Sequence, residues 1–229
     1  MVRSYNQFCP VAKAAELFCE RWTALIIREL ATGSARFSDI QRGVPLMSPT
    51  LLSRRLKQLV AEAVIERRRD GARGAWRYAL TPAGRELVPL VMALGIWGQR
   101  WSRRELAANE KDLGLLLWAL EKGAKPEIFG TGRRIIEFEF KDQPQSKRRW
   151  WYLNEAGRCE LCLTAPDRAS DIYVQTTLDD LIYVWRGDLA LGVAISSGRL
   201  EIHASRQLAR AFRDWLAIAP IADVAAARV

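Results

Sequence analysis

The sequence predicts an α+β protein with two modules, and three observations lead to this expectation. The 229 residues, 49% hydrophobic and 27% charged, suffice for one large or two small domains with a buried core. The net charge of +9 is uneven: residues 1–105 hold 18 lysines and arginines against 9 aspartates and glutamates, whereas residues 106–229 hold 17 of each. Apolar spacing is mainly helical in the first half and mixes helical and strand-like segments in the second. We therefore expect a basic module over residues 1–105 and an α+β module with a mostly antiparallel sheet over residues 106–229.

The composition also limits where the protein works and what it binds. No apolar run approaches the roughly 18–20 residues that a membrane-spanning helix needs, and the first residues, MVRSYNQFCPVAK, lack the apolar core of a signal peptide. Four cysteines in a chain of this length do not indicate a disulfide framework. We therefore expect a cytoplasmic protein without stable membrane association. The basic first half favours a polyanionic partner, although charge alone does not separate nucleic acid from an acidic membrane.

Three helical segments are predicted before residue 44. Residues 10–20 carry apolar side chains at helical spacing. A second helix is expected over residues 22–33, with Leu25, Ile26 and Leu30 buried and Gly33 ending it. Phe37 then precedes Ser38, which we expect to cap a third, short helix.

An amphipathic helix is predicted to start at Ser48, because serine is a favoured N-cap and Pro49 fits the first helical position. At about 100° per residue, one side of this helix collects the apolar residues Leu52, Leu56, Leu59 and Ala63. The other side collects hydroxyl groups and cations, namely Thr50, Arg54 and Lys57, with Ser53 at its flank. A lone helix of this kind is more often a solvated surface than a binding face, so its neighbours decide the interpretation.

The neighbouring residues form a basic hairpin. Strand-like runs at residues 64–68 and 76–80 flank a turn that contains Asp70, Gly71 and Gly74. Helices followed by such a hairpin give the order of a winged helix-turn-helix, whose third helix enters the major groove of DNA while the hairpin contacts a neighbouring groove or phosphates. Arginine pairs with guanine, and serine, threonine and lysine contact phosphates or bases. We therefore predict DNA contacts at Ser48, Thr50, Ser53, Arg54, Arg55, Lys57, Arg69, Arg73 and Arg77.

A longer helix follows from Thr81, which can cap it, and Pro82, which suits its first turn. Its apolar stripe consists of Leu87, Leu90, Val91, Leu94, Trp97 and Trp101. The stripe is either core against the next domain or the seam of a dimer. We favour the seam and expect a homodimer, because DNA-binding proteins commonly present two symmetric recognition helices.

Residues 8–104 resemble the HxlR family of bacterial winged-helix transcription regulators. The resemblance rests on CPVAKAAELFCERWTALIIRELATGSARFSDIQRGVPLMSPTLLSRRLKQLVAEAVIERR and YALTPAGREL…LGIWGQRW, whose motifs occur in the order of the family. It implies a homodimer that binds double-stranded operator DNA and represses or activates nearby genes. The chain departs from the family at Cys19, Glu20 and Arg21, where Gly-Gly-Lys is common.

The same resemblance gives Cys9 two interpretations. Some HxlR-type regulators sense oxidants or electrophiles through the cysteine that matches Cys9, and a thiol near a helix N-terminus can be activated for this role. The alternative is a small apolar residue that packs where a helix begins.

The second half predicts helices gathered around a sheet. An amphipathic helix is expected between residues 107 and 126, and strands are expected over residues 133–140, 149–154, 158–165, 170–177 and 198–204. Further helices are expected over residues 178–188, 189–196 and 206–217.

This order resembles the sterol-carrier-protein type 2 fold over about residues 130–218, on the segment ASDIYVQTTLDDLIYVWRGDLALGVAISSGRLEIHASRQLARAFRDWL. The resemblance implies a domain that encloses an apolar or lipid-like small-molecule effector. Aromatic residues that could line such a cavity are Trp118, Trp150, Trp151, Tyr173, Trp185 and Trp215. The alternative is that these residues are ordinary core.

Catalysis and metal binding are not predicted. Cys159 and Cys162 lie three residues apart on an expected strand, so their side chains point to opposite faces, and a zinc site needs four ligands. The sequence contains no glycine-rich phosphate loop with lysine and no Ser–His–Asp order. We expect a ligand-responsive DNA-binding regulator with no metal, cofactor or enzymatic activity. The alternative is a lipid-binding or carrier protein whose basic half contacts acidic membranes.

Overall fold

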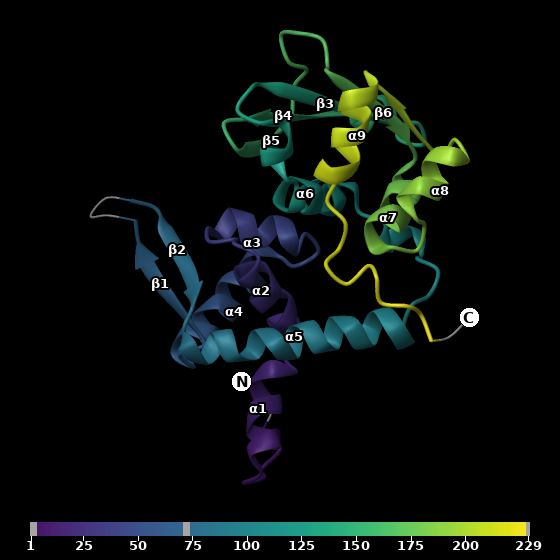
Figure 1. Cartoon of the computed structure of the whole chain (residues 1–229). Helices are drawn as coiled ribbons and strands as arrows, with labels where there is room; N and C mark the ends of the chain where they lie inside the picture. Colours follow the sequence, from purple (N-terminus) through teal and green to yellow (C-terminus); the bar gives the residue numbers. More distant parts are fainter. Residues whose placement is uncertain (1–3, 71–73, 228–229) are drawn as a thin grey trace. The chain divides into compact units, whose positions relative to one another are not determined.

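The computed structural model describes residues 4–70 and 74–227, and the chain forms two compact units, Met1–Trp97 and Gly98–Val229 (Figure 1). The division falls inside the long helix Pro82–Trp101, eight residues before the boundary expected from charge. Within the described residues, no helix combines the length and apolar character that crossing a bilayer requires.

The first unit consists of a helical cluster, a two-stranded antiparallel hairpin and a long helix (Figure 1). Its elements are α1 (Pro10–Phe18), α2 (Thr23–Ala31), α3 (Phe37–Gly43), α4 (Pro49–Ala61), β1 (Ile65–Arg69), β2 (Trp76–Leu80) and α5 (Pro82–Trp101). Their order is that of the predicted winged helix-turn-helix. One apolar core joins α2, α3, α4 and β1, and its fully buried members include Ile26, Ile40, Leu52, Leu56 and Leu59.

Two details of the early helices differ from the prediction. Leu25 is exposed, because Ile26, Ile27 and Leu30 fill the inward side of α2. Ser38 does not cap α3. The N-cap is Arg36, two residues earlier, and the Asp39 carboxylate accepts the backbone N–H of Arg36 at 3.1 Å, so an acidic side chain of the first turn satisfies this end.

Thr81 ties the start of α5 to the hairpin, as its capping role predicts. Its hydroxyl donates to the carbonyl oxygen of Ala63 at 2.6 Å and accepts the backbone N–H of Gly84 at 3.1 Å. A Cβ atom on Gly84 would overlap the carbonyl oxygen of Val64, so glycine permits this close approach. The direction of α5 is thereby fixed relative to α4 and β1.

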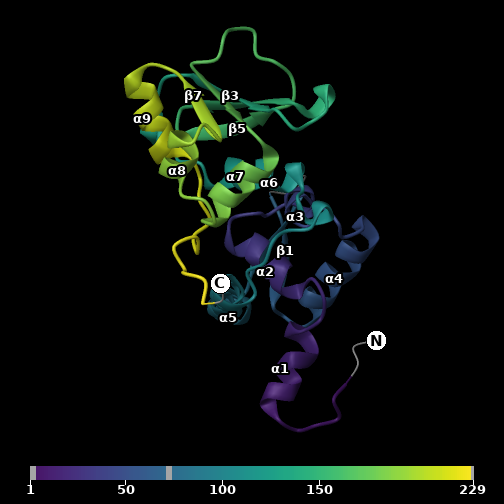
Figure 2. The same ribbon diagram turned by 90° about the vertical axis from the view of Figure 1, so that its right-hand side faces the viewer.

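The second unit is an α+β domain with a five-stranded sheet. Its helices are α6 (Leu113–Gly123), α7 (Leu178–Arg186), α8 (Leu191–Ser196) and α9 (Arg206–Trp215). Its strands are β3 (Arg134–Phe140), β4 (Arg149–Glu155), β5 (Arg158–Cys162), β6 (Ile172–Thr176) and β7 (Leu200–His203), and three short 3-10 helices (Ala108–Glu110, Pro126–Phe129 and Gln145–Lys147) connect elements. Figure 2 shows α6 and α7 on the same side of the sheet.

The sheet is mixed, which corrects the expectation of a mostly antiparallel one. The strand order is β5-β4-β3-β6-β7, and β3 and β6 run parallel while the other neighbours are antiparallel. The chain reaches β6 only after leaving the β3–β4–β5 meander and crossing to the far edge of β3. One face of the sheet packs on α6, α7 and α9, and large side chains fill this interior, including Phe138, Phe140, Tyr152, Phe212 and Trp215.

Candidate nucleic-acid interface

The α4 helix has one apolar side and one polar side, as its periodicity predicts. Leu52, Leu56 and Leu59 are fully buried in the core of the first unit. The Ser48 hydroxyl oxygen accepts the backbone N–H of Leu51 at 3.3 Å, so it caps the helix. These contacts hold the opposite side of α4 toward solvent.

The outward side of α4 presents the predicted hydroxyl groups and cations. Thr50, Arg54 and Lys57 are exposed and Ser53 is half-buried. Together with Pro49 they border a shallow groove of about 510 Å³. The structure thus brings four of the predicted contact residues onto one continuous surface that carries two positive charges.

Arg55 does not belong to this surface, which corrects its predicted role. Its side chain is 9% exposed and its guanidinium contacts the Glu20 carboxylate at 3.0 Å. A second guanidinium nitrogen donates to the side-chain oxygen of Gln58 at 2.6 Å. Arg55 therefore joins the segment between α1 and α2 to α4, and it is paired inside the unit.

The hairpin arginines divide between two faces. Because side chains alternate along a strand, Arg67 and Arg69 share the face of buried Ile65, whereas Arg68 lies on the other. Arg68 pairs with Glu66 at 2.7 Å, and Arg77 of the facing strand pairs with Asp70 at 2.9 Å. The predicted contact Arg73 lies outside the described residues.

Aromatic side chains cover the inner face of the hairpin. The register places Tyr78 opposite Arg67 and Trp76 opposite Arg69. The Arg67 guanidinium carbon lies 4.0 Å from the centre of the Trp76 ring, and that of Arg69 lies 5.0 Å from it. The contact between Arg67 and Trp76 was not predicted from the sequence. The alternation of side chains counted from Ile65 could have placed Arg67 and Arg69 on one face.

The six aromatic residues predicted to line a ligand cavity are not brought together. Trp215 is fully buried and its indole N–H donates to the Asn154 side-chain oxygen at 2.7 Å. Trp151 and Tyr173 lie on the opposite face of the sheet, since both stand beside Glu137 in register and each follows a residue that faces the core. Trp118 is buried, while Trp150 and Trp185 are half-buried at the edge of the core. The six side chains therefore do not face one common space, and the alternative of ordinary core describes buried Trp118 and Trp215.

The cysteines are placed as follows. Cys9 directly precedes α1 and is half-buried, so both interpretations, oxidant sensing and packing at a helix start, stay open. Cys159 stands opposite Asn154 and Cys162 opposite Trp151, so the two thiols lie on opposite faces of the sheet, as predicted. Burial, assisted by the nearby Glu121 charge, raises the pKa of Cys159 to about 12, so this thiol stays protonated at neutral pH.

Among residues 4–70 and 74–227, no group of three or more His, Cys, Asp or Glu side chains is arranged to hold a metal ion.

Comparison with known proteins identifies the first half of the chain. The family described as HxlR-like helix-turn-helix matches residues 17–106. The uncharacterized HTH-type transcriptional regulator YvaP of Bacillus subtilis (strain 168) is 36% identical over 98 residues, which make up 42% of this chain and 91% of that protein. The uncharacterized HTH-type transcriptional regulator Rv3095 of Mycobacterium tuberculosis (strain ATCC 25618 / H37Rv) is 39% identical over 97 residues, which are 41% of this chain and 60% of that relative.

Among solved structures, the reduced form of the transcriptional regulator YodB from B. subtilis is 30% identical, with 41% of this chain and 93% of that chain covered and a TM-score of 0.36. The family match spans the segment from the end of α1 to just beyond α5, and therefore includes α4 and the hairpin. HTH-type regulators act by binding DNA, which agrees with the cationic outer side of α4. The chain belongs to the HxlR-like helix-turn-helix family of transcriptional regulators.

Proposed function

We propose that the protein is a homodimeric, sequence-specific DNA-binding regulator in which α4 reads the major groove. The observation that carries this proposal is the outward side of α4, where Thr50, Ser53, Arg54 and Lys57 lie opposite the buried apolar side of the helix. Arginine can discriminate guanine through two hydrogen bonds, while hydroxyl groups and lysine fix the register on phosphates. The hairpin, with Arg69 on its inner face and Arg77 on its outer face, contacts the flanking backbone or minor groove.

We expect the purified protein to enrich particular sequences from a random pool of duplex DNA. The selected duplex should bind roughly 10³-fold or more tightly than unselected duplex, and both affinities should fall as salt rises because bound counterions are released. Fluorescence anisotropy across a salt series measures both properties. Flotation with vesicles of anionic phosphatidylglycerol tests the alternative of a membrane-contacting carrier. Vesicle binding together with equal affinity for selected and unselected DNA would overturn the proposed function.

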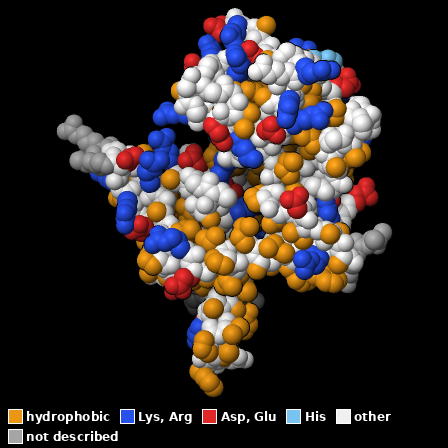
Figure 3. All heavy atoms as spheres, in the orientation of Figure 1, with side chains coloured by type: hydrophobic (Ala, Val, Ile, Leu, Met, Phe, Trp, Pro, Cys, Tyr) orange, Lys and Arg blue, Asp and Glu red, His pale blue; other side chains and the backbone are white. Residues whose placement is uncertain are grey.

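The homodimer is proposed through α5, whose outward stripe is left exposed by the described residues of its own unit. Leu90, Leu94 and Trp97 are 53%, 52% and 58% exposed, whereas Leu87 and Val91 of the same helix pack on the core. Helix α1 nearby has no buried residue, and Val11 is 75% exposed. Figure 3 shows hydrophobic side chains gathered over α5 and α1. Apolar surface of this kind indicates an interface, and a two-fold dimer buries the same stripe from both copies.

The second unit is proposed to receive an apolar or lipid-like effector. Support comes from the resemblance of residues 130–218 to a sterol-carrier fold and from the apolar interior between the sheet and helices α6, α7 and α9. Because that interior is filled by aromatic side chains, an effector would have to displace some of them. If the displaced arrangement differs between two conformations of the protein, the effector binds them with different free energies, which coupling to DNA binding requires.

We expect native mass spectrometry of freshly purified protein to show a bound small molecule. Stripping it, or adding back saturated fatty acids as probes, should change the affinity for the selected duplex by about 5–150-fold. The test uses the full-length protein, because it reports both the binding of the small molecule and the binding of DNA. An affinity that is the same in the stripped and probe-saturated protein would refute regulation by such a molecule.

A further inference from the structure

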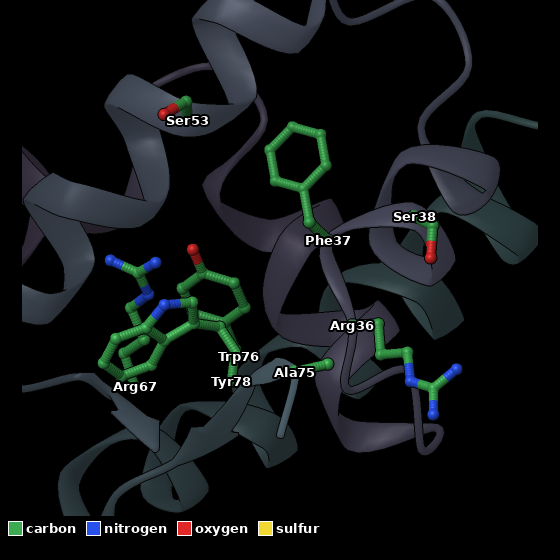
Figure 4. A pocket seen from close by; sticks show the side chains of 8 residues that line it. All are labelled: Arg36, Phe37, Ser38, Ser53, Arg67, Ala75, Trp76 and Tyr78. Atoms are coloured by element: carbon green, nitrogen blue, oxygen red, sulfur yellow. The ribbon is translucent and has the colours of Figure 1, made fainter. Parts of the chain in front are cut away.

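A second groove lies between the start of α3, the Ser53 flank of α4 and the hairpin (Figure 4). Its volume is about 450 Å³, and its lining is part aromatic and part polar: Arg36, Phe37, Ser38, Ser53, Arg67, Ala75, Trp76 and Tyr78. Ser53 also borders the groove along the outward side of α4, so the two hollows share this lining residue. All of these residues belong to the first unit.

Three polar side chains, Arg67, Tyr78 and Ser53, lie toward one side of this groove. In Figure 4, Arg67, Trp76 and Tyr78 form one wall, and the Tyr78 hydroxyl points toward the side on which Ser53 lies. The Arg36 guanidinium extends away at the opposite end, and the Phe37 ring stands between the two ends. A ligand in the groove would therefore meet one guanidinium and two hydroxyl groups next to aromatic surface.

Trp76 restrains Arg67 without consuming its hydrogen-bond donors. The Arg67 guanidinium lies over the Trp76 ring at 4.0 Å and within 6.0 Å of the Tyr78 ring, and contacts to ring faces leave the N–H edge of the guanidinium available. Trp76 is itself 43% exposed, which is unusual for so large an apolar ring. The Arg69 guanidinium carbon also lies 5.0 Å from the centre of the same ring. Contacts with two arginines explain why the Trp76 ring lies at the surface.

We propose that this groove seats one nucleotide of the DNA backbone, with its phosphate on Arg67, and that Trp76 is the positioning residue that orients Arg67. This inference rests on the proposed function, in which α4 lies in the major groove of DNA and the hairpin lies on the neighbouring groove. The DNA backbone that separates these two grooves must then pass between α4 and the hairpin. Arg67 and the hydroxyl groups of Ser53 and Tyr78 match a phosphodiester, which is an anion with several acceptor oxygens. The Phe37 ring offers an apolar contact for the deoxyribose.

The test compares Arg67→Ala with Arg68→Ala, its neighbour on the opposite face of the same strand. Arg67→Ala should weaken binding roughly tenfold, equally on selected and unselected duplex DNA, and should reduce the slope of log affinity against log salt by about 1. Arg68→Ala should change the affinity far less, because the Arg68 charge is already paired with Glu66 at 2.7 Å. Equal losses of affinity for the two variants would show that only net charge matters, and would overturn the proposed phosphate site at Arg67.

The positioning role is tested by a double-mutant cycle. Trp76→Ala should weaken binding about twofold to fivefold, Trp76→Phe should restore part of that loss, and neither should lower the melting temperature appreciably because Trp76 is largely outside the core. In the Arg67→Ala background, Trp76→Ala should cost clearly less than in the wild-type background, and the remaining loss would come from Arg69, which also lies over this ring. Additive losses would overturn the positioning role. Failure of the wild-type protein to bind any duplex would refute the proposed function itself, whereas wild-type binding with an unaffected Arg67→Ala variant would refute only this inference.

Discussion

Arg54→Ala and Arg55→Ala are expected to separate DNA binding from folding, although the two residues are neighbours on α4. Arg54 is exposed on the groove-bordering side of the helix. Its loss should weaken binding to the selected duplex by about 1–3 kcal/mol and relax base preference at one position of the site. The free energy of unfolding should change by no more than about 0.5 kcal/mol, as is usual for exposed positions.

Arg55→Ala should give the opposite result. The substitution removes the contact to Glu20 at 3.0 Å and leaves Gln58 without the hydrogen bond that Arg55 donates to it. The Glu20 side chain is 33% exposed and can be partly rehydrated, so we expect a loss of roughly 1–3 kcal/mol in the free energy of unfolding rather than the larger penalty of a fully buried unpaired charge. The fraction that remains folded should bind DNA with unchanged affinity and base preference.

Urea denaturation and anisotropy titration on the same samples measure both quantities. Arg55→Met provides a matched control, because it keeps an apolar stem along α4 and removes the guanidinium with its charge and its hydrogen bonds to Glu20 and Gln58. If Arg55→Ala reduced DNA affinity at full stability, Arg55 would have to leave Glu20 and turn outward when DNA binds. The assignment of the two faces of α4 would then be wrong.

The two faces of α4 could be predicted from spacing, but the partner of Arg55 could not. At about 100° per residue, Arg55 lies about 60° from Leu52 around the helix, so the spacing already placed it near the apolar side. Its positive charge favoured the DNA surface instead. The residue that decides the question is Glu20, 35 positions earlier in the chain, and only the packing of the helices brings it within reach.

The hairpin illustrates the same limit at the level of strand register. Both strands were predicted almost at their observed bounds, and alternation alone groups Arg67 with Arg69. The stack on Trp76 depends in addition on the pairing of Arg69 with Trp76, which the length and shape of the turn determine. A one-residue shift would move Trp76 to the face of Arg68, and the groove beside α4 would lose one wall.

In the second unit, local patterns identified the elements but not their arrangement. The strands β3, β4 and β5 follow one another through short turns, which favours antiparallel pairing. The parallel pair of β3 and β6 joins segments that are more than 30 residues apart, and no local pattern determines which edge of the meander β6 joins. The six aromatic side chains do not face one common space for a simpler reason. Trp150 and Trp151 are adjacent on one strand, so they cannot line the same side of a sheet.

Leu94→Asp is expected to convert the protein to a monomer and to weaken binding to a two-fold selected duplex by roughly 10²–10⁴-fold. Leu94 lies in the middle of the exposed stripe on α5, four residues after Leu90 and three before Trp97, and its side chain is 52% exposed within the unit. In a dimer, a carboxylate there would be buried against the apolar stripe of the other copy, and desolvation would oppose association. Without the partner copy, binding of the second half-site is no longer intramolecular, so the gain from two linked sites disappears.

Met92→Asp is the matched control, because it places the same charge on the same helix about 160° away from Leu94 around the axis. Met92 is 42% exposed, so both substitutions start from exposed apolar side chains. Sedimentation at micromolar concentration should show Leu94→Asp at half the mass of the wild type and Met92→Asp at the wild-type mass, and circular dichroism should show both variants folded. Affinity for a duplex with a single half-site should be the same for all three proteins, because the outward side of α4 does not depend on α5 pairing. Two results would contradict a dimer interface at α5: a wild-type protein that sediments as a monomer, or a Leu94→Asp protein that stays dimeric with full affinity for the two-fold duplex.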